Sequence, residues 1–334
     1  MTIEQLQKLP KIELHCHLDG SLSKKFIQER LGRPVADEEL CVSQDCTSLL
    51  EYLEKFELPL QCLTDEEGFE GAGYDVMKTM AQEQVCYAEI RFAPLLSVKT
   101  GRTEAEQLDS KQVTAALIKG LERGRREFGI DYGVIVCAMR HHSIEDNYEM
   151  IKAASQFLGK GVCAADLAGA EAQYPMRQFM ELFERVKELG MPFTIHAGEC
   201  GNAENIADAL KAGAARIGHG IAMRGNPKLQ KMAADAQTGI EMCPVSNLQT
   251  KASKCAAEYP LREFLDAGLC VTVNTDNRTV SGTSMTKELA FIQKTYGIRD
   301  DEIMLLMENA VRAAFADEAV KERLRRKLEE FRTC

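Results

Sequence analysis

The sequence predicts an α/β fold, a (β/α)8 TIM barrel, and two observations support this prediction. Eight short segments rich in apolar and β-branched residues recur along the 334 residues and are separated mostly by helix-like spans. Histidines and carboxylates stand where several of these segments end, and barrels of this class gather their functional residues at the carboxyl ends of the strands. The segments are 11–17, 85–94, 132–141, 162–169, 192–199, 216–220, 240–247 and 269–277.

The spans between these segments carry helical patterns. Residues 178–189 and 203–212 place apolar side chains three and four positions apart, as amphipathic helices do. The long span after the first strand has its own helical patterns, so we expect a helical insertion at 21–84, placed to cover the barrel mouth. Further helices at 284–332 are expected to flank the barrel. No linker or internal repeat divides the chain, which predicts one domain over residues 1–334.

Composition limits the partners and the location. The formal net charge is −10, whereas binding to nucleic acid requires concentrated Lys and Arg, so we expect a small-molecule substrate and no nucleic acid. No targeting segment precedes the first strand, and no apolar run approaches the roughly 20 residues of a membrane span, which predicts a cytoplasmic protein with no membrane partner. The 12 cysteines form no Cys-x-x-Cys pair, which favours reduced, packed thiols.

The first predicted strand ends with two histidines, His15 and His17. Residues i and i+2 of a strand project from the same face, so both imidazoles can bind one metal ion. His196 and Asp276 stand at the ends of two later strands. Three imidazoles and one carboxylate suit zinc with a position left for water, whose pKa bound zinc lowers to about 7. The fourth segment, 162–169, holds no lysine to bridge a second ion, so we expect one Zn²⁺ per chain.

Two further residues are candidates for catalysis. Glu199 follows His196 by three positions, which suits a carboxyl group that supplies or shuttles a proton beside the metal. His219 ends the sixth strand and can orient or deprotonate the attacking water. Each has a structural alternative: Glu199 as a carboxylate that orients a histidine ligand, and His219 as a hydrogen-bonded core residue. Together they favour hydrolysis over metal storage. His141 and His142 have no comparable partners and are expected either in a loop or as residues that support the site from behind its ligands.

The motifs resemble those of the adenosine deaminase family. They follow the family's order from the first predicted strand to the last, so together they are specific although each is weak alone. The motifs are His15-Cys-His-Leu-Asp-Gly-Ser, Asp166-Leu-Ala-Gly-Ala-Glu, His196-Ala-Gly-Glu, Arg216-Ile-Gly-His-Gly and Asn274-Thr-Asp.

The resemblance implies a purine-salvage enzyme that hydrolytically deaminates adenosine and 2′-deoxyadenosine to inosine and 2′-deoxyinosine, releasing ammonia. It implies that Glu199 donates a proton to purine N1 and that His219 is the base that orients hydroxide. It also implies that the backbone N–H of Gly169 contacts N3, and that Asp19 reaches the ribose with His17 beside it. The metal ligands implied by the resemblance are His15, His17, His196 and Asp276.

Asn277 departs from the family pattern, in which many members carry a second Asp expected to contact purine N7. N7 is an acceptor, and a carboxamide donates a hydrogen bond at any pH, so Asn277 is chemically suited to this contact. Two alternatives stay open. The first is a sibling deaminase acting on adenine or another 6-aminopurine conjugate. The second is a catalytically silent metal-binding or nucleoside-binding protein, which the presence of both Glu199 and His219 disfavours.

Overall fold

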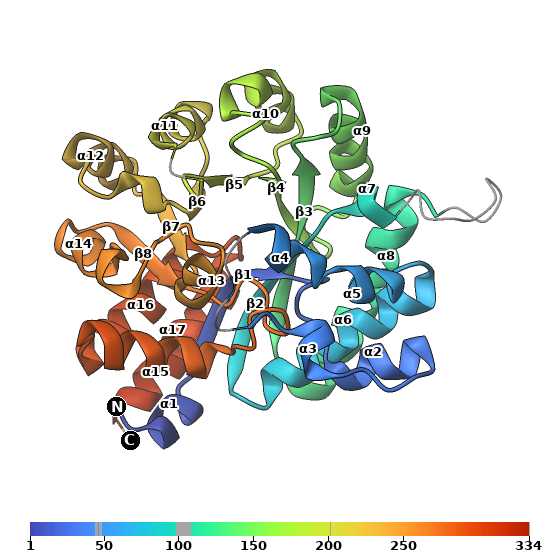
Figure 1. Ribbon diagram of the computed structural model, residues 1–334, viewed down its shortest axis with the longest axis horizontal. Coiled ribbons are helices and arrows are strands. Elements are labelled where there is room, and N and C mark those ends of the chain that lie inside the picture. Colours follow the sequence, from blue (N-terminus) through green and yellow to red (C-terminus); the bar gives the residue numbers. More distant parts are fainter. Residues whose placement is uncertain (44–45, 47–48, 98–107, 201, 334) are drawn as a thin grey trace.

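The computed structural model describes residues 1–43, 46, 49–97, 108–200 and 202–333, and parallel strands lie at its centre with helices around them (Figure 1). The eight strands follow the order and the approximate positions that the sequence predicts. They are β1 (Lys11–His17), β2 (Val85–Phe92), β3 (Asp131–Met139), β4 (Val162–Ala168), β5 (Thr194–Ala197), β6 (Arg216–His219), β7 (Gly239–Met242) and β8 (Cys270–Val273).

The strands form a closed (β/α)8 barrel. Strands β1 to β4 pair in order as one parallel sheet, and β5 to β8 pair in order as a second. A parallel bridge between Ala165 and Phe193 joins β4 to the start of β5, and another between Cys16 and Asp276 joins β1 to the residues after β8. The predicted fold class is therefore correct.

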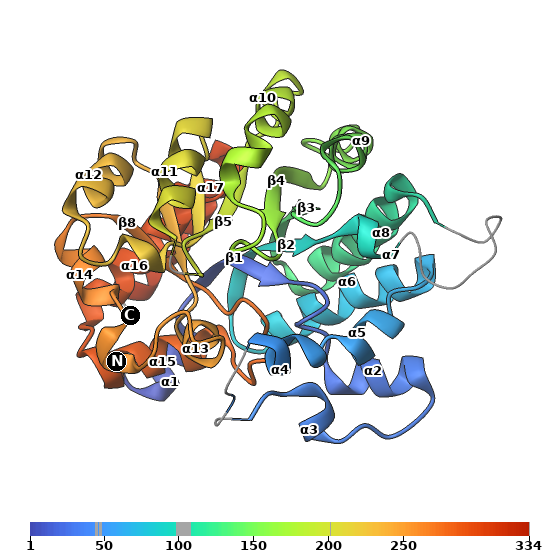
Figure 2. The same ribbon diagram turned by 45° about the horizontal axis from the view of Figure 1, so that its top comes forward.

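The helices cover the outside of the strands, as Figure 2 shows for α9 to α12 beside β3 to β6. The helix predicted at 203–212 forms with those bounds, and the one predicted at 178–189 forms as the short helix η2 followed by α10. The helices up to β5 are α1 (Ile3–Lys8), α2 (Lys24–Leu31), α3 (Asp37–Leu40), α4 (Leu49–Glu54), α5 (Glu57–Gln61), α6 (Glu66–Ala81), α7 (Pro94–Ser97), α8 (Ser110–Phe128), α9 (Ile144–Ser155), η2 (Met176–Phe179) and α10 (Met180–Glu188). Those after β5 are α11 (Ala203–Ala212), η3 (Ile221–Met223), α12 (Pro227–Asp235), α13 (Pro244–Gln249), η4 (Ala256–Glu258), α14 (Leu261–Asp266), α15 (Met285–Tyr296), α16 (Asp300–Ala313) and α17 (Glu318–Thr333).

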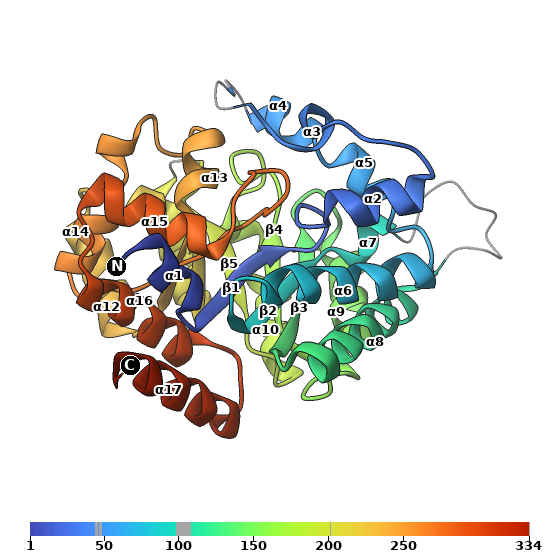
Figure 3. The ribbon, with the colours of Figure 1, turned by 90° about the horizontal axis from the view of Figure 1, so that it is seen from below.

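The predicted insertion after the first strand is helical, but its last helix is part of the barrel. Helix α6 packs against α8 and β2, as a regular connector between β1 and β2 does. Helices α2 to α5 precede it, and Figure 3 places α3 to α5 beyond the carboxyl end of β1, on the side of the molecule away from α17. The segment that lies over this end of the barrel is therefore shorter than 21–84.

The predicted strand at 240–247 is wrong in its second half. The strand β7 ends at Met242, and Pro244 begins helix α13. Proline is well suited to the first turn of a helix, because its backbone has no N–H to donate and its φ angle is already helical. The apolar character of this stretch reflects burial, which a helix and a strand share.

The inside of the barrel holds a layer of buried ion pairs. Arg91 lies 2.9 Å from Asp166 and 2.8 Å from Glu241, and Arg216 lies 2.5 Å from both Glu89 and Glu241. All five side chains are fully buried. This layer underlies the carboxyl ends of the strands.

Over the described residues, no helix combines the length and apolar character that crossing a membrane demands.

Candidate metal-dependent active site

The carboxyl ends of three strands bring the four predicted metal ligands together. His15 and His17 come from β1, His196 from β5, and Asp276 follows β8. Nε2 of His17 lies 3.2 Å from Nε2 of His196 and 3.4 Å from Oδ1 of Asp276. Nε2 of His15 lies 3.5 Å from the same carboxylate oxygen. Three ring nitrogens and one oxygen thus face a common centre.

Buried carboxylates fix the orientation of two of these histidines. Nδ1 of His15 lies 2.7 Å from Glu241, and Nδ1 of His196 lies 2.9 Å from Asp166. Because each Nδ1 faces a carboxylate, Nε2 of each ring is directed toward the common centre. Metal-binding histidines usually have a carboxylate or a carbonyl at the second ring nitrogen, which fixes the orientation of the ring. Arg91 contacts both carboxylates and so connects the two supports.

The side chains present fit a divalent metal ion. Nε2 of His15 is buried and makes no hydrogen bond within the described residues. Burial opposes ionisation of this ring, but Asp276 and Glu241 beside it raise its pKa, so a metal ion would bind there by displacing a proton. Burial lowers the pKa of His17 and of His196, so both imidazoles are neutral. Burial opposes ionisation of Asp276, but His15 and His17 beside it hold the pKa of its carboxyl group well below the usual range. Neutral imidazoles and an ionised carboxylate are the forms that bind metals.

The backbone at Asp276 adopts a conformation that few non-glycine residues take, with a φ of 61°. Its N–H donates to the carbonyl of His15, and its carbonyl accepts from the N–H of His17. The hydroxyl of Ser246 donates to Oδ2 at 2.6 Å, which leaves Oδ1 facing the histidines. Such strain persists where the surrounding structure over-determines it, and functional sites are its commonest location.

Glu199 lies after β5 on the rim of this centre. Thr250 donates a hydrogen bond to its Oε1 at 3.2 Å, and its Oε2 lies 3.8 Å from Nε2 of His219. Burial, with the nearby negative charges of Asp276 and Glu171, raises the pKa of Glu199 to about 8. The carboxyl group is therefore protonated near neutral pH and can act as an acid.

His219 ends β6 with a φ of 64°, a second strained non-glycine backbone in the site. The side-chain nitrogen of Asn247 lies 2.9 Å from its Nδ1, which directs Nε2 toward Glu199. Ligand atoms of His219, His15 and Asp276 also lie within 4.8 Å of one another. His219 is thus near enough to the centre to orient a water molecule there.

The residues expected to contact substrate lie around the same end of the barrel. Gly169 directly follows β4 and has a φ of 105°, a conformation that other residues rarely adopt. Asp19 accepts a hydrogen bond from the N–H of Gly20, and burial raises the pKa of its carboxyl group to about 6. Asn277 is buried, and a Cβ on Gly20 would fall 1.9 Å from its Oδ1, so Gly20 must be glycine for Asn277 to fit.

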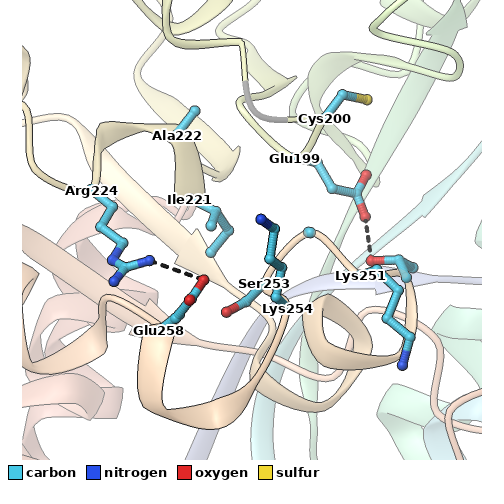
Figure 4. Close-up of a pocket in the computed structure, with 11 residues that line it drawn as sticks. Glu199, Cys200, Ile221, Ala222, Arg224, Lys251, Ser253, Lys254 and Glu258 are labelled. Atoms are coloured by element: carbon cyan, nitrogen blue, oxygen red, sulfur yellow. Dashed lines mark hydrogen bonds and ion pairs between the residues drawn. The ribbon is translucent and has the colours of Figure 1, made fainter. Parts of the chain in front are cut away.

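A pocket of about 450 Å³ adjoins Glu199 (Figure 4). Its wall combines Ile221 and Ala222 from the residues after β6 with the segment Thr250–Lys254, which follows α13. The carboxyl group of Glu199 points toward this segment in Figure 4. The acid therefore stands between the predicted metal centre and a pocket.

Sequence reasoning missed the residues that support the site. Asp166 and Glu241 behind the histidines, Thr250 on Glu199 and Asn247 on His219 have no predicted role. A signal for one of them exists, because Glu241 is a charged residue between Ile240 and Met242 in a buried strand, and a buried charge requires partners. His141 and His142, predicted in a loop, do follow the end of β3.

Comparison with known proteins matches the sequence of this chain to one family. The sequence model described as adenosine deaminase matches residues 10–331. The adenosine deaminase of Enterococcus faecalis is 38% identical over 339 residues, covering 99% of each chain. This chain belongs to the adenosine deaminase family.

Two solved structures show the same architecture. The adenine deaminase of Arthrobacter aurescens superposes with a TM-score of 0.86 at 25% identity, over 98% of this chain and 100% of that one. An amidohydrolase from Burkholderia ambifaria, solved with bound Zn, gives a TM-score of 0.87 at 21% identity, over 99% of this chain and 93% of that one. The adenosine deaminase family is metal-dependent, and this member is a hydrolytic deaminase.

Proposed function

We propose that this protein is a zinc-dependent aminohydrolase of adenosine and 2′-deoxyadenosine, acting as one catalytic domain over residues 1–334. The observation that supports it best is the convergence of three imidazoles and one carboxylate beside a carboxyl group that is protonated near neutral pH. The relative from Enterococcus faecalis is an adenosine deaminase, which supports adenosine as the substrate here.

In this proposal four side chains would hold one zinc ion, which when bound would lower the pKa of a water molecule beside it. Nitrogen and oxygen donors in this number suit zinc, with a further position for solvent. The ligands are His15, His17, His196 and Asp276.

Glu199 donates a proton to N1 of the purine. Protonation at N1 withdraws electron density from C6, the carbon that carries the amino group, so that water attacks it more readily. Nε2 of His219 orients the attacking water, because Asn247 holds the ring from its other nitrogen. Proton transfer by a well-placed side chain contributes a factor of about 10²–10⁴ in rate.

The remaining contacts orient the nucleoside. The backbone N–H of Gly169 donates to N3, and the side-chain amide of Asn277 donates to N7. Asp19, with His17 beside it, contacts the ribose. The ribose is present in a nucleoside and absent from free adenine, so this contact would favour the nucleoside.

A second candidate substrate is adenine, because the Arthrobacter aurescens structure is an adenine deaminase with nearly complete overlap. The two candidates share C6 chemistry and differ in the sugar. Binding of the ribose by Asp19 is the feature that favours the nucleoside.

The test is to assay adenosine, 2′-deoxyadenosine and adenine by ammonia release and by the purine ultraviolet spectrum. We expect turnover of both nucleosides at least about 100-fold above adenine, since lost polar contacts discriminate strongly. Chelation should abolish activity, and added Zn²⁺ should restore it. Turnover that survives complete metal removal, or a preference for adenine, would contradict the proposal.

A further inference from the structure

Glu171 is a buried carboxyl group that receives four hydrogen bonds at the edge of the proposed active site. Its Oε1 accepts from the backbone N–H of Gly198 at 2.6 Å and from the side chain of Asn205 at 2.8 Å. Its Oε2 accepts from the backbone N–H groups of Glu199 and Cys200, both at 3.1 Å. Three consecutive main-chain amides therefore converge on one carboxyl group.

These three amides belong to the turn that carries Glu199. Gly198 begins the turn with a φ of 77°, and a Cβ there would fall 2.4 Å from Ile206, so only glycine fits at this position. Consecutive N–H groups that point to one side form a concave site for an anion. Here Glu171, from the loop after β4, supplies the anion from within the protein.

The carbonyl side of the same turn is held as well. The guanidinium of Arg140, which follows β3, donates to the carbonyl of His196 at 2.7 Å and to that of Tyr174. Asn205 also accepts from the N–H of Met176, so one side chain joins the loop after β4 to α11. The main chain on both sides of Glu199 is thus fixed by buried groups from neighbouring strands and loops.

We propose that Glu171 is a positioning residue for the proton donor, holding the main chain of residues 198–200 so that the carboxyl group of Glu199 faces the substrate. This inference rests on the acid role of Glu199 given above. A displacement of about 1 Å in a catalytic group can lower the rate about 100-fold, so a substitution behind the acid affects catalysis without any contact to substrate.

Glu171 also acts on Glu199 through its charge. After burial and the charge of Asp276, it is the next contribution that raises the pKa of Glu199. The other charged or titratable groups around Glu199 come from several elements. They are His15 on β1, His219 on β6, Asp276 after β8, Cys200 next to Glu199, and Arg224, Lys251, Lys254 and Glu258 around the pocket.

The test is Glu171→Gln in the full-length, metal-loaded protein. Glutamine keeps the shape but loses the charge, and it turns an N–H₂ group toward one pair of donors. We expect kcat to fall about 10- to 100-fold with KM changed less than about threefold, because positioning acts on the chemical step. We also expect the alkaline limb of kcat/KM to move down by about half to one pH unit, because a negative charge beside Glu199 is lost.

Glu302→Gln is the matched control. Glu302 lies on the outer helix α16, where it accepts from the N–H of Arg299 and pairs with Arg262. Its loss should lower the melting temperature and leave kcat and the pH profile unchanged. A pH profile that shifts equally in both variants would overturn the proposal, since a general loss of stability would then explain both.

A parallel measurement on Glu199→Gln tests the acid role of Glu199 separately from the positioning role of Glu171. If Glu199→Gln keeps normal turnover, the acid role fails and the positioning role fails with it. If Glu199→Gln is inactive but Glu171→Gln keeps the wild-type kcat and alkaline limb, the positioning role alone is wrong. Should Glu171→Gln fail to fold, Asn205→Asp removes one donor to Glu171 and keeps the acceptor for Met176. A kcat several-fold below wild type then supports the proposal, and an unchanged kcat overturns it.

Discussion

The site has two halves, and the surrounding structure supports them in different ways. The metal-ligand half consists of His15, His17, His196 and Asp276, and the substrate half consists of Asp19, Gly169 and Asn277. In the first half, His15 and His196 are each backed by a fully buried carboxylate, and Arg91 joins the two carboxylates. In the second half, Asp19 accepts a hydrogen bond from the residue next to it in sequence. The position of Gly169 depends on the backbone conformation at the end of β4.

This difference indicates which half can vary without loss of the fold. Breaking a buried ion pair by removing one partner costs about 3–5 kcal/mol, because a charge is left buried and unpaired. Substitutions behind the histidines are therefore expected to affect metal binding and folding together. Substitutions at Asn277 or Asp19 should change substrate binding alone. Purine recognition can diverge within the family while the metal centre stays constant.

The largest effect on activity is expected at Glu199, between the two halves. Glu199→Gln keeps the hydrogen-bonding shape but has no proton to donate, so kcat should fall by about 10²–10⁴. Metal content, measured by elemental analysis, should stay at one ion per chain, because Glu199 is not among the proposed ligands. Loss of the metal in this variant would indicate that Glu199 is itself a metal ligand.

The same variant tests whether Glu199 controls the pH dependence of kcat/KM. The pKa of Glu199 is raised to about 8, so its proton is present at neutral pH and is lost as the pH rises through that value. For the wild type we expect kcat/KM to decline above about pH 8, and for Glu199→Gln we expect this limb to be absent. An identical alkaline limb in both proteins would assign that titration to another group.

A smaller effect, confined to the ligand half, is expected from Asp166→Asn. Asp166 faces Nδ1 of His196, and its loss should weaken metal binding by about 10- to 100-fold, as is usual for such supports. Competition with a metal chelator measures this affinity directly. Asp75→Asn is the control, since Asp75 accepts two hydrogen bonds from Ser23 and, among the residues that the structure describes, pairs with neither the histidines nor their carboxylates. Equal losses of affinity in both variants would mean that general destabilisation, and not the support of His196, controls metal binding.

The sequence was sufficient to predict the fold class and where the polar residues gather, because both depend on local patterns. Short apolar segments separated by helical patterns predict the eight strands. The barrel then brings the carboxyl ends of these strands together. Segment 240–247 shows the limit: burial makes a helix and a strand look alike, and Pro244 was the local signal for the change.

The supporting carboxylates could not be predicted in the same way. Glu241 and His15 are 226 residues apart, and Glu171 reaches the turn at Glu199 from 28 residues away. These partners are set by the register of strands around the barrel, which no local spacing encodes. The strained backbone at His219 and Asp276 is likewise held by tertiary contacts, since a positive φ is uncommon for any non-glycine residue and no local motif predicts it at these two positions.

The smallest expected effect, and the sharpest probe of the substrate half, is Asn277→Asp. The carboxamide donates a hydrogen bond at any pH, whereas a carboxyl group donates only when protonated. The variant should retain its metal ion and melting temperature, with a KM for adenosine raised several-fold at neutral pH and nearer wild type in acid. Steady-state kinetics from about pH 5 to 9 measure this. The side chain of Asn277 is buried against Gly20, so a substitution that keeps its size tests hydrogen bonding without disturbing that contact. If KM is unchanged across the whole range, Asn277 does not contact N7, and its role is to pack against Gly20 at the rim of the site.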